Sequence, residues 1–170
     1  MKDGRPLLIT AEMPPDILEW ADAMRRAYFP PERNRLKAHV TLFHALPPST
    51  EPEVRDLLAE LAKSAPPEAR VTGLMKLGGG TALAIESPGV TELHEIIQDR
   101  MWGVLTKQDQ QKRKKLHITI QNKVSGEEAR ALQAKLGPVL DHKRFSFSGL
   151  GLYHYVDGLW EHQRSFAFRG

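Results

Sequence analysis

A four-residue pattern occurs twice in this chain, as His39-Val40-Thr41-Leu42 and as His117-Ile118-Thr119-Ile120. In each copy polar and apolar residues alternate, which is typical of a β-strand with one packed face and one open face. The histidine and the threonine two positions later therefore project from the same face of the strand. Two matching strands that each carry an imidazole and a hydroxyl indicate an acid–base pair built by duplication.

The segments around the two motifs repeat one order of elements. In each half a helix, the motif strand, a further helix and a hairpin follow one another, and positions 39 and 117 set an offset of 78 residues. This repeated order indicates an internal pseudo-two-fold, and we expect a single domain over residues 1–170 with pseudo-repeat halves at about 1–88 and 89–170. The predicted strands are 7–11, 38–45, 70–77, 81–86, 115–121, 145–156 and 159–168, and a helix is predicted over 90–106.

Helix boundaries are marked by proline and by capping patterns. A first helix begins at Pro14-Pro15 and ends before Pro30-Pro31. Thr50 with Glu53, and Ser125 with Glu128, match the capping box, so we expect each pair to begin a helix.

Composition limits the class of protein. A length of 170 residues with 41% hydrophobic residues suits one globular domain. The absence of cysteine excludes disulfides, thiolate nucleophiles and zinc–thiolate sites. The apolar stretch Leu7-Leu8-Ile9 is too short for a signal peptide, and no apolar run is long enough to cross a bilayer. We therefore expect a soluble, cytoplasmic monomer with no membrane partner.

Basic residues precede both motifs, although the net charge is only +3. They are Arg33, Arg35 and Lys37 before the first motif, and Lys112, Arg113, Lys114 and Lys115 before the second. A basic approach to each histidine favours an anionic ligand, above all phosphate, and the alternative is a pair of solvated loops. If the strands extend backward, Arg35 and Lys115 share the face of the following histidine and are candidate substrate contacts.

Two imidazoles that flank one ligand atom can act as general base and general acid. The threonine hydroxyls Thr41 and Thr119 are neutral donors suited to non-bridging phosphoryl oxygens. In-line displacement at phosphorus then needs neither a cofactor nor a metal. A zinc site on His39 and His117 is the alternative, but no third ligand recurs at motif spacing, and we expect no metal.

The paired His-x-Thr-x motifs, the Gln121-Asn122-Lys123 segment and a closing hairpin with Tyr153, Trp160 and Phe168 resemble the two-histidine (2H) phosphoesterase superfamily. The branch that the chain resembles is the bacterial 2′-5′ RNA ligase-like proteins, related to RNA 2′,3′-cyclic phosphodiesterases. The resemblance implies a bilobal α+β fold, with a cleft between two antiparallel sheets and the helices outside.

The resemblance also implies an activity, the metal-independent opening of a cyclic phosphodiester to a 2′-phosphate. His39 matches the proton donor to the leaving O3′, His117 matches the base that activates water, and Thr41 and Thr119 match the phosphate-contacting hydroxyls. Alternation alone treats the two histidines alike, so the acid and base roles are interchangeable at this point. The chain lacks the arginine that many relatives place directly after the first motif, where Phe43 and His44 stand instead.

Three neighbouring residues have two interpretations each. Phe43 follows Thr41 on the open face and could stack on a nucleobase, or it lies at the edge of the core. Gln121 continues the face of His117 and could donate to a phosphate, or it is an ordinary polar strand residue. His44 has the opposite parity from His39, so we expect it to point away from the cleft and to be structural.

Three functions remain open from the sequence. The first is a cyclic phosphodiesterase that acts on RNA with a cyclic phosphate end or on a small cyclic nucleotide. The second is an RNA- or nucleotide-binding module without turnover, and the third is a reversible 2′-5′ RNA ligase.

Overall fold

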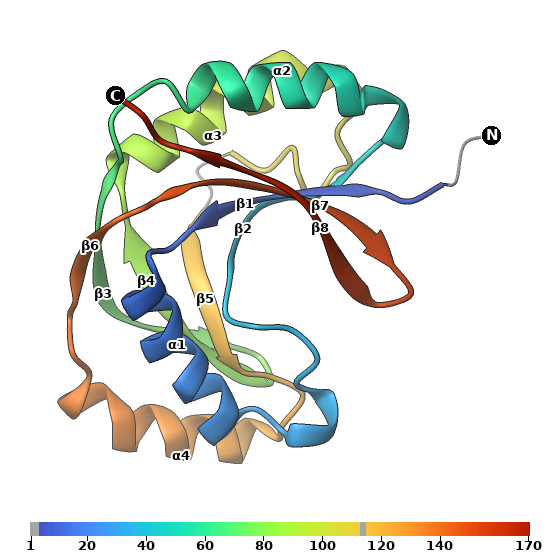
Figure 1. Ribbon diagram of the computed structural model, residues 1–170. Coiled ribbons are helices and arrows are strands. Elements are labelled where there is room, and N and C mark those ends of the chain that lie inside the picture. Colours follow the sequence, from blue (N-terminus) through green and yellow to red (C-terminus); the bar gives the residue numbers. More distant parts are fainter. Residues whose placement is uncertain (1–3, 113–114) are drawn as a thin grey trace.

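The computed structural model describes residues 4–112 and 115–170. Within these residues, two four-stranded antiparallel sheets face each other across the molecule (Figure 1). The first sheet has the order β2-β1-β7-β8 and the second has the order β5-β4-β3-β6. The strands are β1 (Leu7–Glu12), β2 (Val40–Leu46), β3 (Glu68–Leu77), β4 (Gly80–Glu86), β5 (Leu116–Gln121), β6 (Arg144–Ser146), β7 (Gly149–Val156) and β8 (Leu159–Ala167). This arrangement confirms the predicted α+β fold.

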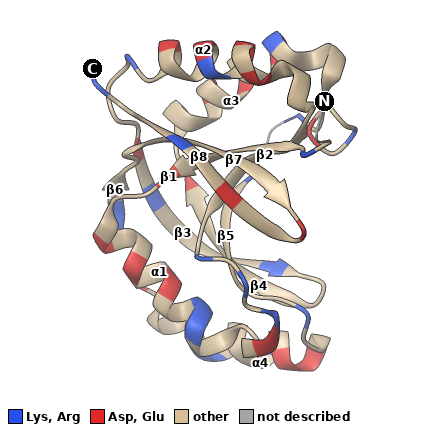
Figure 2. Ribbon diagram, turned by 45° about the vertical axis from the view of Figure 1, so that its right-hand side comes forward, with Lys and Arg blue, Asp and Glu red and all other residues tan. Residues whose placement is uncertain are grey.

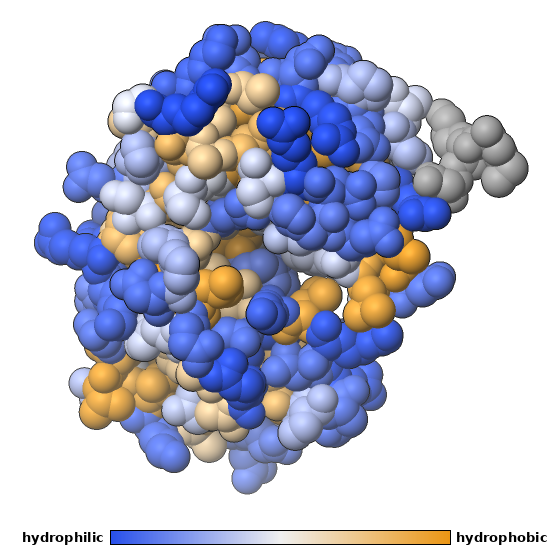
Figure 3. Space-filling model, in the orientation of Figure 1, coloured by the Kyte–Doolittle hydropathy of each residue, from blue (hydrophilic) through white to orange (hydrophobic). Residues whose placement is uncertain are grey.

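Four α-helices of the described residues cover the outside of the sheets. They are α1 (Pro15–Tyr28), α2 (Glu51–Leu61), α3 (Pro88–Met101) and α4 (Gly126–Leu136), and short 3-10 turns span Pro31–Arg33, Pro48–Thr50, Trp102–Val104 and Gly137–Val139. Helices α2 and α3 lie in the upper part of the view in Figure 1, whereas α1 and α4 lie in its lower part. Charged residues mark the outer faces of these helices (Figure 2). The space-filling view shows a hollow between the upper and lower lobes (Figure 3).

Each sheet takes two strands from each half of the sequence. Strands β1 and β2 pair with β7 and β8 from the C-terminal end, and β3 and β4 pair with β5 and β6. The motif strands β2 and β5 are edge strands of different sheets and contact each other. The two sheets therefore meet along the motif strands, and this contact brings the two motifs together.

The helices pack their apolar stripes against the sheets because their buried residues recur at helical spacing. In α2 these are Val54, Leu57 and Leu58. In α3 they include Val90, Leu93 and Ile97. The core formed in this way is continuous across both sheets.

Two predicted elements have other bounds in the structure, and the two capping patterns differ in their hydrogen bonds. The predicted strand 145–156 is divided into β6 and β7, which belong to different sheets. The chain crosses between the sheets at Phe147 and Ser148: the N–H of Phe147 donates to the carbonyl of Pro67, directly before β3, and the N–H of Ser148 donates to the carbonyl of Glu12 in β1. The helix predicted over 90–106 ends at Met101. The capping pattern holds at Ser125, whose hydroxyl accepts from the N–H of Glu128 at 3.1 Å. At Thr50 a helix also begins as predicted, because α2 starts at Glu51, but the Thr50 hydroxyl donates to the carbonyl of Pro47 and does not cap the helix.

A β-bulge interrupts the first motif strand. Ile9 of β1 pairs with Phe43, but the next residue, Thr10, pairs with Thr41. Leu42 is thus an additional residue, and Leu42 and Phe43 are both buried. Because a bulge changes which face the following side chains occupy, the simple alternation of the sequence fails beyond Thr41.

Candidate active site

The two motif histidines have the same local geometry. His39 Nδ1 lies 2.7 Å from the carbonyl oxygen of Lys37, and His117 Nδ1 lies 3.0 Å from the carbonyl oxygen of Lys115. A carbonyl oxygen only accepts, so each Nδ1 carries the hydrogen and donates it. The proton-exchanging atom of each ring is therefore Nε2, and the backbone two residues earlier holds each ring in this tautomer.

His39 lies in an environment that disfavours its protonation. Burial lowers the pKa of His39 to about 4, and the positive charges of Arg25, His117 and His44 contribute to the lowering. The hydrogen bond to Lys37 opposes this shift. Since the charge of His117 acts on His39, the two imidazoles share one electrostatic site. At neutral pH His39 is uncharged in the free protein.

Thr41 and Thr119 lie on the two contacting strands, each two residues after its histidine. Both are half-buried, as are His39 and His117, whereas the alternate residues Val40, Leu42 and Ile118 are buried. All four motif side chains are therefore partly accessible to solvent, on two strands that contact each other.

Arg25 of α1 forms a hydrogen bond with the backbone of the second motif. It is 3% exposed, and its Nη1 donates to the carbonyl oxygen of Thr119 at 2.9 Å. Its Nε donates to Asn34 at 3.1 Å, and the guanidinium lies 4.4 Å from the centre of the Phe29 ring. Burial lowers the pKa of Arg25 and nearby Asp22 opposes that effect. A guanidinium remains charged under these conditions, so Arg25 adds a fixed positive charge to the site.

An aromatic cavity adjoins His39. Trp160 lies with its ring centre 4.4 Å from that of His39, and Tyr153 lies 5.8 Å from Trp160. A cavity of about 370 Å³ is lined by these three residues together with Arg35 and Leu159. Arg35 is exposed and lines the same cavity as His39, and its contact with a substrate stays a prediction.

A second cavity, of about 290 Å³, lies on the other side of Tyr153 and also reaches His39. Thr10 and Glu12 of β1 line it. Burial and the charge of Glu12 raise the pKa of the Tyr153 hydroxyl. A Cβ atom at Gly151 would lie 2.6 Å from Glu12 Oε2 and 2.7 Å from Thr10 Oγ1, so glycine leaves room for these two side chains.

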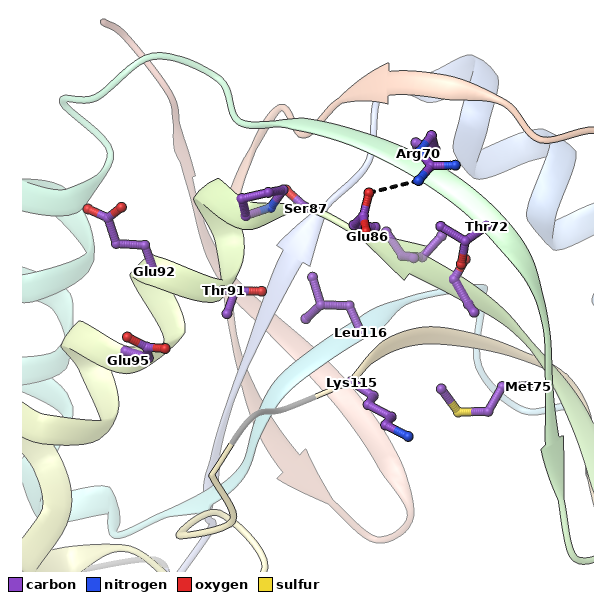
Figure 4. Close-up of a pocket in the computed structure, with 13 residues that line it drawn as sticks. Arg70, Thr72, Met75, Glu86, Ser87, Thr91, Glu92, Glu95, Lys115 and Leu116 are labelled. Atoms are coloured by element: carbon purple, nitrogen blue, oxygen red, sulfur yellow. Dashed lines mark hydrogen bonds and ion pairs between the residues drawn. The ribbon is translucent and has the colours of Figure 1, made fainter.

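A larger cavity of about 880 Å³ lies beside Lys115 and Leu116, directly before the second motif (Figure 4). Its lining includes Lys115, two residues before His117, and Ala84, the strand partner of His117. Thr91 and Glu95 of α3 form the opposite side. Lys115 is exposed and lines this cavity, and its contact with a substrate stays a prediction. Arg113 and Lys114 of the basic segment lie outside the described residues.

Phe43 and Gln121 do not face the cleft. Phe43 is 0% exposed and stacks on His94 of α3 with ring centres 4.6 Å apart, because the bulge turns it into the core. Gln121 is 5% exposed, and its Oε1 accepts from the hydroxyl of Thr81 at 3.0 Å. A register shift between Thr81 and Ala82 places Gln121 beside Thr81. Nucleobase stacking by Phe43 and substrate contact by Gln121 are both wrong.

The same bulge corrects the prediction for His44. Its side chain is 33% exposed and its charge acts on His39, so it lies on the side of the motif histidines. Its Nδ1 lies 3.1 Å from Oδ1 of Asp109, a residue of the segment before β5.

Sequence reasoning missed Arg25, Trp160 and Asp109 as residues of the site. Each is distant in sequence from the motif that it contacts. The Asp157-Gly158 turn predicts the hairpin that carries Trp160. It does not predict that this hairpin packs beside His39.

The described residues contain no group of three or more histidine and acidic side chains that could hold a metal ion. Over the same residues, no helix is both long enough and apolar enough to cross a membrane.

Comparison with known proteins identifies the fold and the family. TT0787 of Thermus thermophilus superposes with a TM-score of 0.69 at 19% identity, over 97% of this chain and 98% of that one. E. coli LigT complexed with 3′-AMP gives 0.62 at 18% identity, over 99% and 100%. A protein described as a phosphoesterase gives 0.61 at 17% identity, over 98% and 99%. A comparison with curated proteins gives no match.

These structural likenesses establish a common fold. The family model of the 2′-5′ RNA ligase superfamily matches residues 13–159, which include both histidine motifs and the start of the closing hairpin. The chain therefore belongs to the 2′-5′ RNA ligase superfamily of two-histidine phosphoesterases, whose function is of the phosphodiesterase or ligase type.

Proposed function

We propose that this protein is a metal-independent phosphodiesterase that opens 2′,3′-cyclic phosphates, at RNA ends or in nucleotides, to 2′-phosphates. The observation that carries the proposal is the pair of imidazoles whose Nδ1 atoms are both held by backbone carbonyls. Both Nε2 atoms are thereby reserved for proton transfer. A binding module has no need for two such rings held in one tautomer.

In the proposed reaction, water attacks phosphorus and gives its proton to Nε2 of His117. The bond between phosphorus and O3′ breaks, and O3′ takes a proton from Nε2 of His39. The phosphate stays on O2′, so the product is a nucleoside 2′-phosphate. Thr41 and Thr119 donate their hydroxyl hydrogens to the non-bridging oxygens, where negative charge accumulates. The family resemblance supplies the direction of proton transfer.

The low pKa of His39 sets a condition on this mechanism. A proton donor must be charged before the reaction, but the pKa of about 4 leaves His39 neutral at pH 7 in the free protein. A bound phosphodiester brings a negative charge that opposes the positive field of Arg25 and His117, and so raises the pKa of His39. Substrate binding therefore charges the donor in this mechanism. The reverse assignment, with His39 as base, needs no such step.

The aromatic cavity supports a nucleoside as the substrate group. Trp160 and Tyr153 present ring surfaces beside His39, and Arg35 lies at the rim. A cavity of about 370 Å³ accommodates a nucleobase, and stacking on aromatic side chains tolerates any of the four bases. The proposed partners are accordingly RNA with a cyclic phosphate end or a small cyclic nucleotide.

The test is turnover of the four nucleoside 2′,3′-cyclic phosphates, and of cyclic-ended oligonucleotides, in the presence of EDTA. We expect 2′-phosphate products, separated from 3′-phosphates by chromatography. His39→Ala and His117→Ala should each lose activity by at least about 10³-fold. His142→Ala, at an exposed position, is the control and should retain it. Sensitivity to EDTA, or full activity of His117→Ala, would contradict the mechanism, whereas phosphate binding without turnover would indicate a binding module.

The cavity beside Lys115 favours 2′-5′ ligation as a second candidate function (Figure 4). Its volume of about 880 Å³ exceeds what a water molecule needs, and its lining includes Lys115 and Leu116, the two residues before His117, the proposed base. A nucleoside held there would present its 5′-hydroxyl in place of water, and the same proton transfers would yield a 2′-5′ phosphodiester. We expect a 5′-hydroxyl oligonucleotide to divert cyclic-ended RNA into ligated product. Thr91→Trp, which fills the cavity, should suppress ligation and leave hydrolysis unchanged.

A further inference from the structure

The bulge in β2 brings a third imidazole to the motif face. Thr41 pairs with Thr10, Phe43 pairs with Ile9, and Leu46 pairs with Leu7, so β2 contains one additional residue in each interval. Leu42 and Phe43 are both buried, and the next residue, His44, returns to the accessible side with a side chain that is 33% exposed. His44 therefore shares the accessible side of β2 with His39 and Thr41.

The carboxylate of Asp109 fixes the orientation of His44. Oδ1 of Asp109 lies 3.1 Å from His44 Nδ1, and the backbone N–H groups of His44 and Ala45 donate to the same carboxylate at 2.9–3.0 Å. The Asp109 side chain is 1% exposed, and these donors keep the pKa of its carboxyl below the ordinary value in spite of burial. A buried carboxylate accepts and does not donate, so Nδ1 of His44 carries a hydrogen and Nε2 is the outward atom.

The two ring nitrogens of a histidine face opposite ways, so with Nδ1 on Asp109 the Nε2 atom is the one that a ligand can reach. An imidazole with hydrogens on both nitrogens donates from Nε2 to a phosphate oxygen. A residue that merely docked the segment around Asp109 would need the Nδ1 hydrogen bond alone. The partial exposure of the ring on the accessible side of β2, with Nε2 left over, is the feature that such a docking role leaves unexplained.

We propose that His44 is a positioning residue, which binds an anionic oxygen of the substrate or product phosphate through Nε2 while Asp109 holds the ring. This inference rests on the proposed function for the identity of the ligand. It assigns His44 no proton transfer in the reaction. His44 would hold the phosphate, and His39 and His117 would exchange protons with it.

The critical variant is His44→Asn. The Asn amide places a donor near the position of Nδ1, so it preserves the contact with Asp109 but lacks Nε2. We expect an unchanged melting temperature and a weakening of inorganic phosphate and 2′-AMP binding by about 10-fold or more, measured by calorimetry. For cyclic nucleotides KM should rise with little change in kcat. His142→Asn, an exposed histidine far along the sequence, is the matched control and should bind phosphate like the native protein.

A measurement on the native protein covers the case in which His44→Asn fails to fold. In ¹⁵N spectra, phosphate should shift the Nε2 resonance of His44 and leave its Nδ1 resonance near its starting position. The inference would be overturned if folded His44→Asn bound phosphate with an affinity within about twofold of the native protein. It would also be overturned if phosphate did not shift the Nε2 resonance of His44. Native protein that binds phosphate but turns over no cyclic phosphate would instead refute the proposed function and leave the role of His44 standing.

Discussion

Acid should destabilise this protein through His39, and replacing that residue should remove the effect. Burial lowers the pKa of His39 from 6.5 to about 4. Because the unfolded chain has the ordinary pKa, it binds a proton at His39 more readily than the folded protein does. The stability associated with neutral His39 is thus fully present above pH 6.5 and is lost as the pH falls from 6.5 to 4.

The magnitude follows from the two pKa values. Each tenfold difference in proton affinity is worth about 1.4 kcal/mol, so the loss across this window is roughly 3 kcal/mol as an upper bound for a half-buried ring. Other groups also titrate in acid, among them Asp109 and Glu51, whose pKa values are lowered. Comparison with His39→Asn cancels their contribution, because they are present in both proteins.

The assay is urea unfolding of the native protein and of His39→Asn at several pH values between about 7.5 and 4. The native free energy of unfolding minus that of the variant should fall by up to about 3 kcal/mol over this range. Thr119→Val is the control, because it alters the facing strand without removing a titrating group, and its difference from native should stay flat. A difference between native protein and His39→Asn that does not change with pH would refute the argument from burial.

Individual contacts of Phe43, Arg25 and Trp160 predict three further outcomes. Phe43→Ala should cost about 3–5 kcal/mol in urea unfolding, because Phe43 is fully buried against His94, whereas Phe43→Leu should fold and remain active. Arg25→Met should cost about 2–4 kcal/mol and raise the pKa of His39, read by NMR titration, because it leaves the Thr119 carbonyl without its donor and removes a positive charge. Trp160→Ala should uncover His39, raise its pKa toward 6.5 and weaken nucleotide binding by about 10-fold, whereas Trp160→Phe should largely preserve both.

The sequence motifs indicate which side chains carry the proposed chemistry, but they do not indicate which residues surround them. Alternation over four residues sets which side chains share a face, since it depends on the backbone of one strand alone. The structure agrees with this for His39 and Thr41, and for His117 and Thr119. Alternation is unreliable beyond Thr41, because the bulge depends on the register with β1, which precedes the whole of helix α1 in the chain.

Phe43 and His44 show the consequence of that register. A shift of one residue exchanges the two faces of a strand, so the aromatic residue enters the core and the imidazole reaches the accessible side. Nothing within the segment His39–Leu46 distinguishes the two outcomes, because both residues are compatible with a half-buried strand.

By itself, then, the sequence determined the duplicated order of elements and the two His-Thr pairs, because these arise from local periodicity and from repetition, and the family resemblance of these motifs implied the fold class. Tertiary structure alone decided that strands from both halves mix within each sheet, and that Arg25, Trp160 and Asp109 meet the motifs. The physical reason is that sheet pairing joins segments as distant in the chain as Leu7 and His154, and the free energy of that pairing depends on both partners at once.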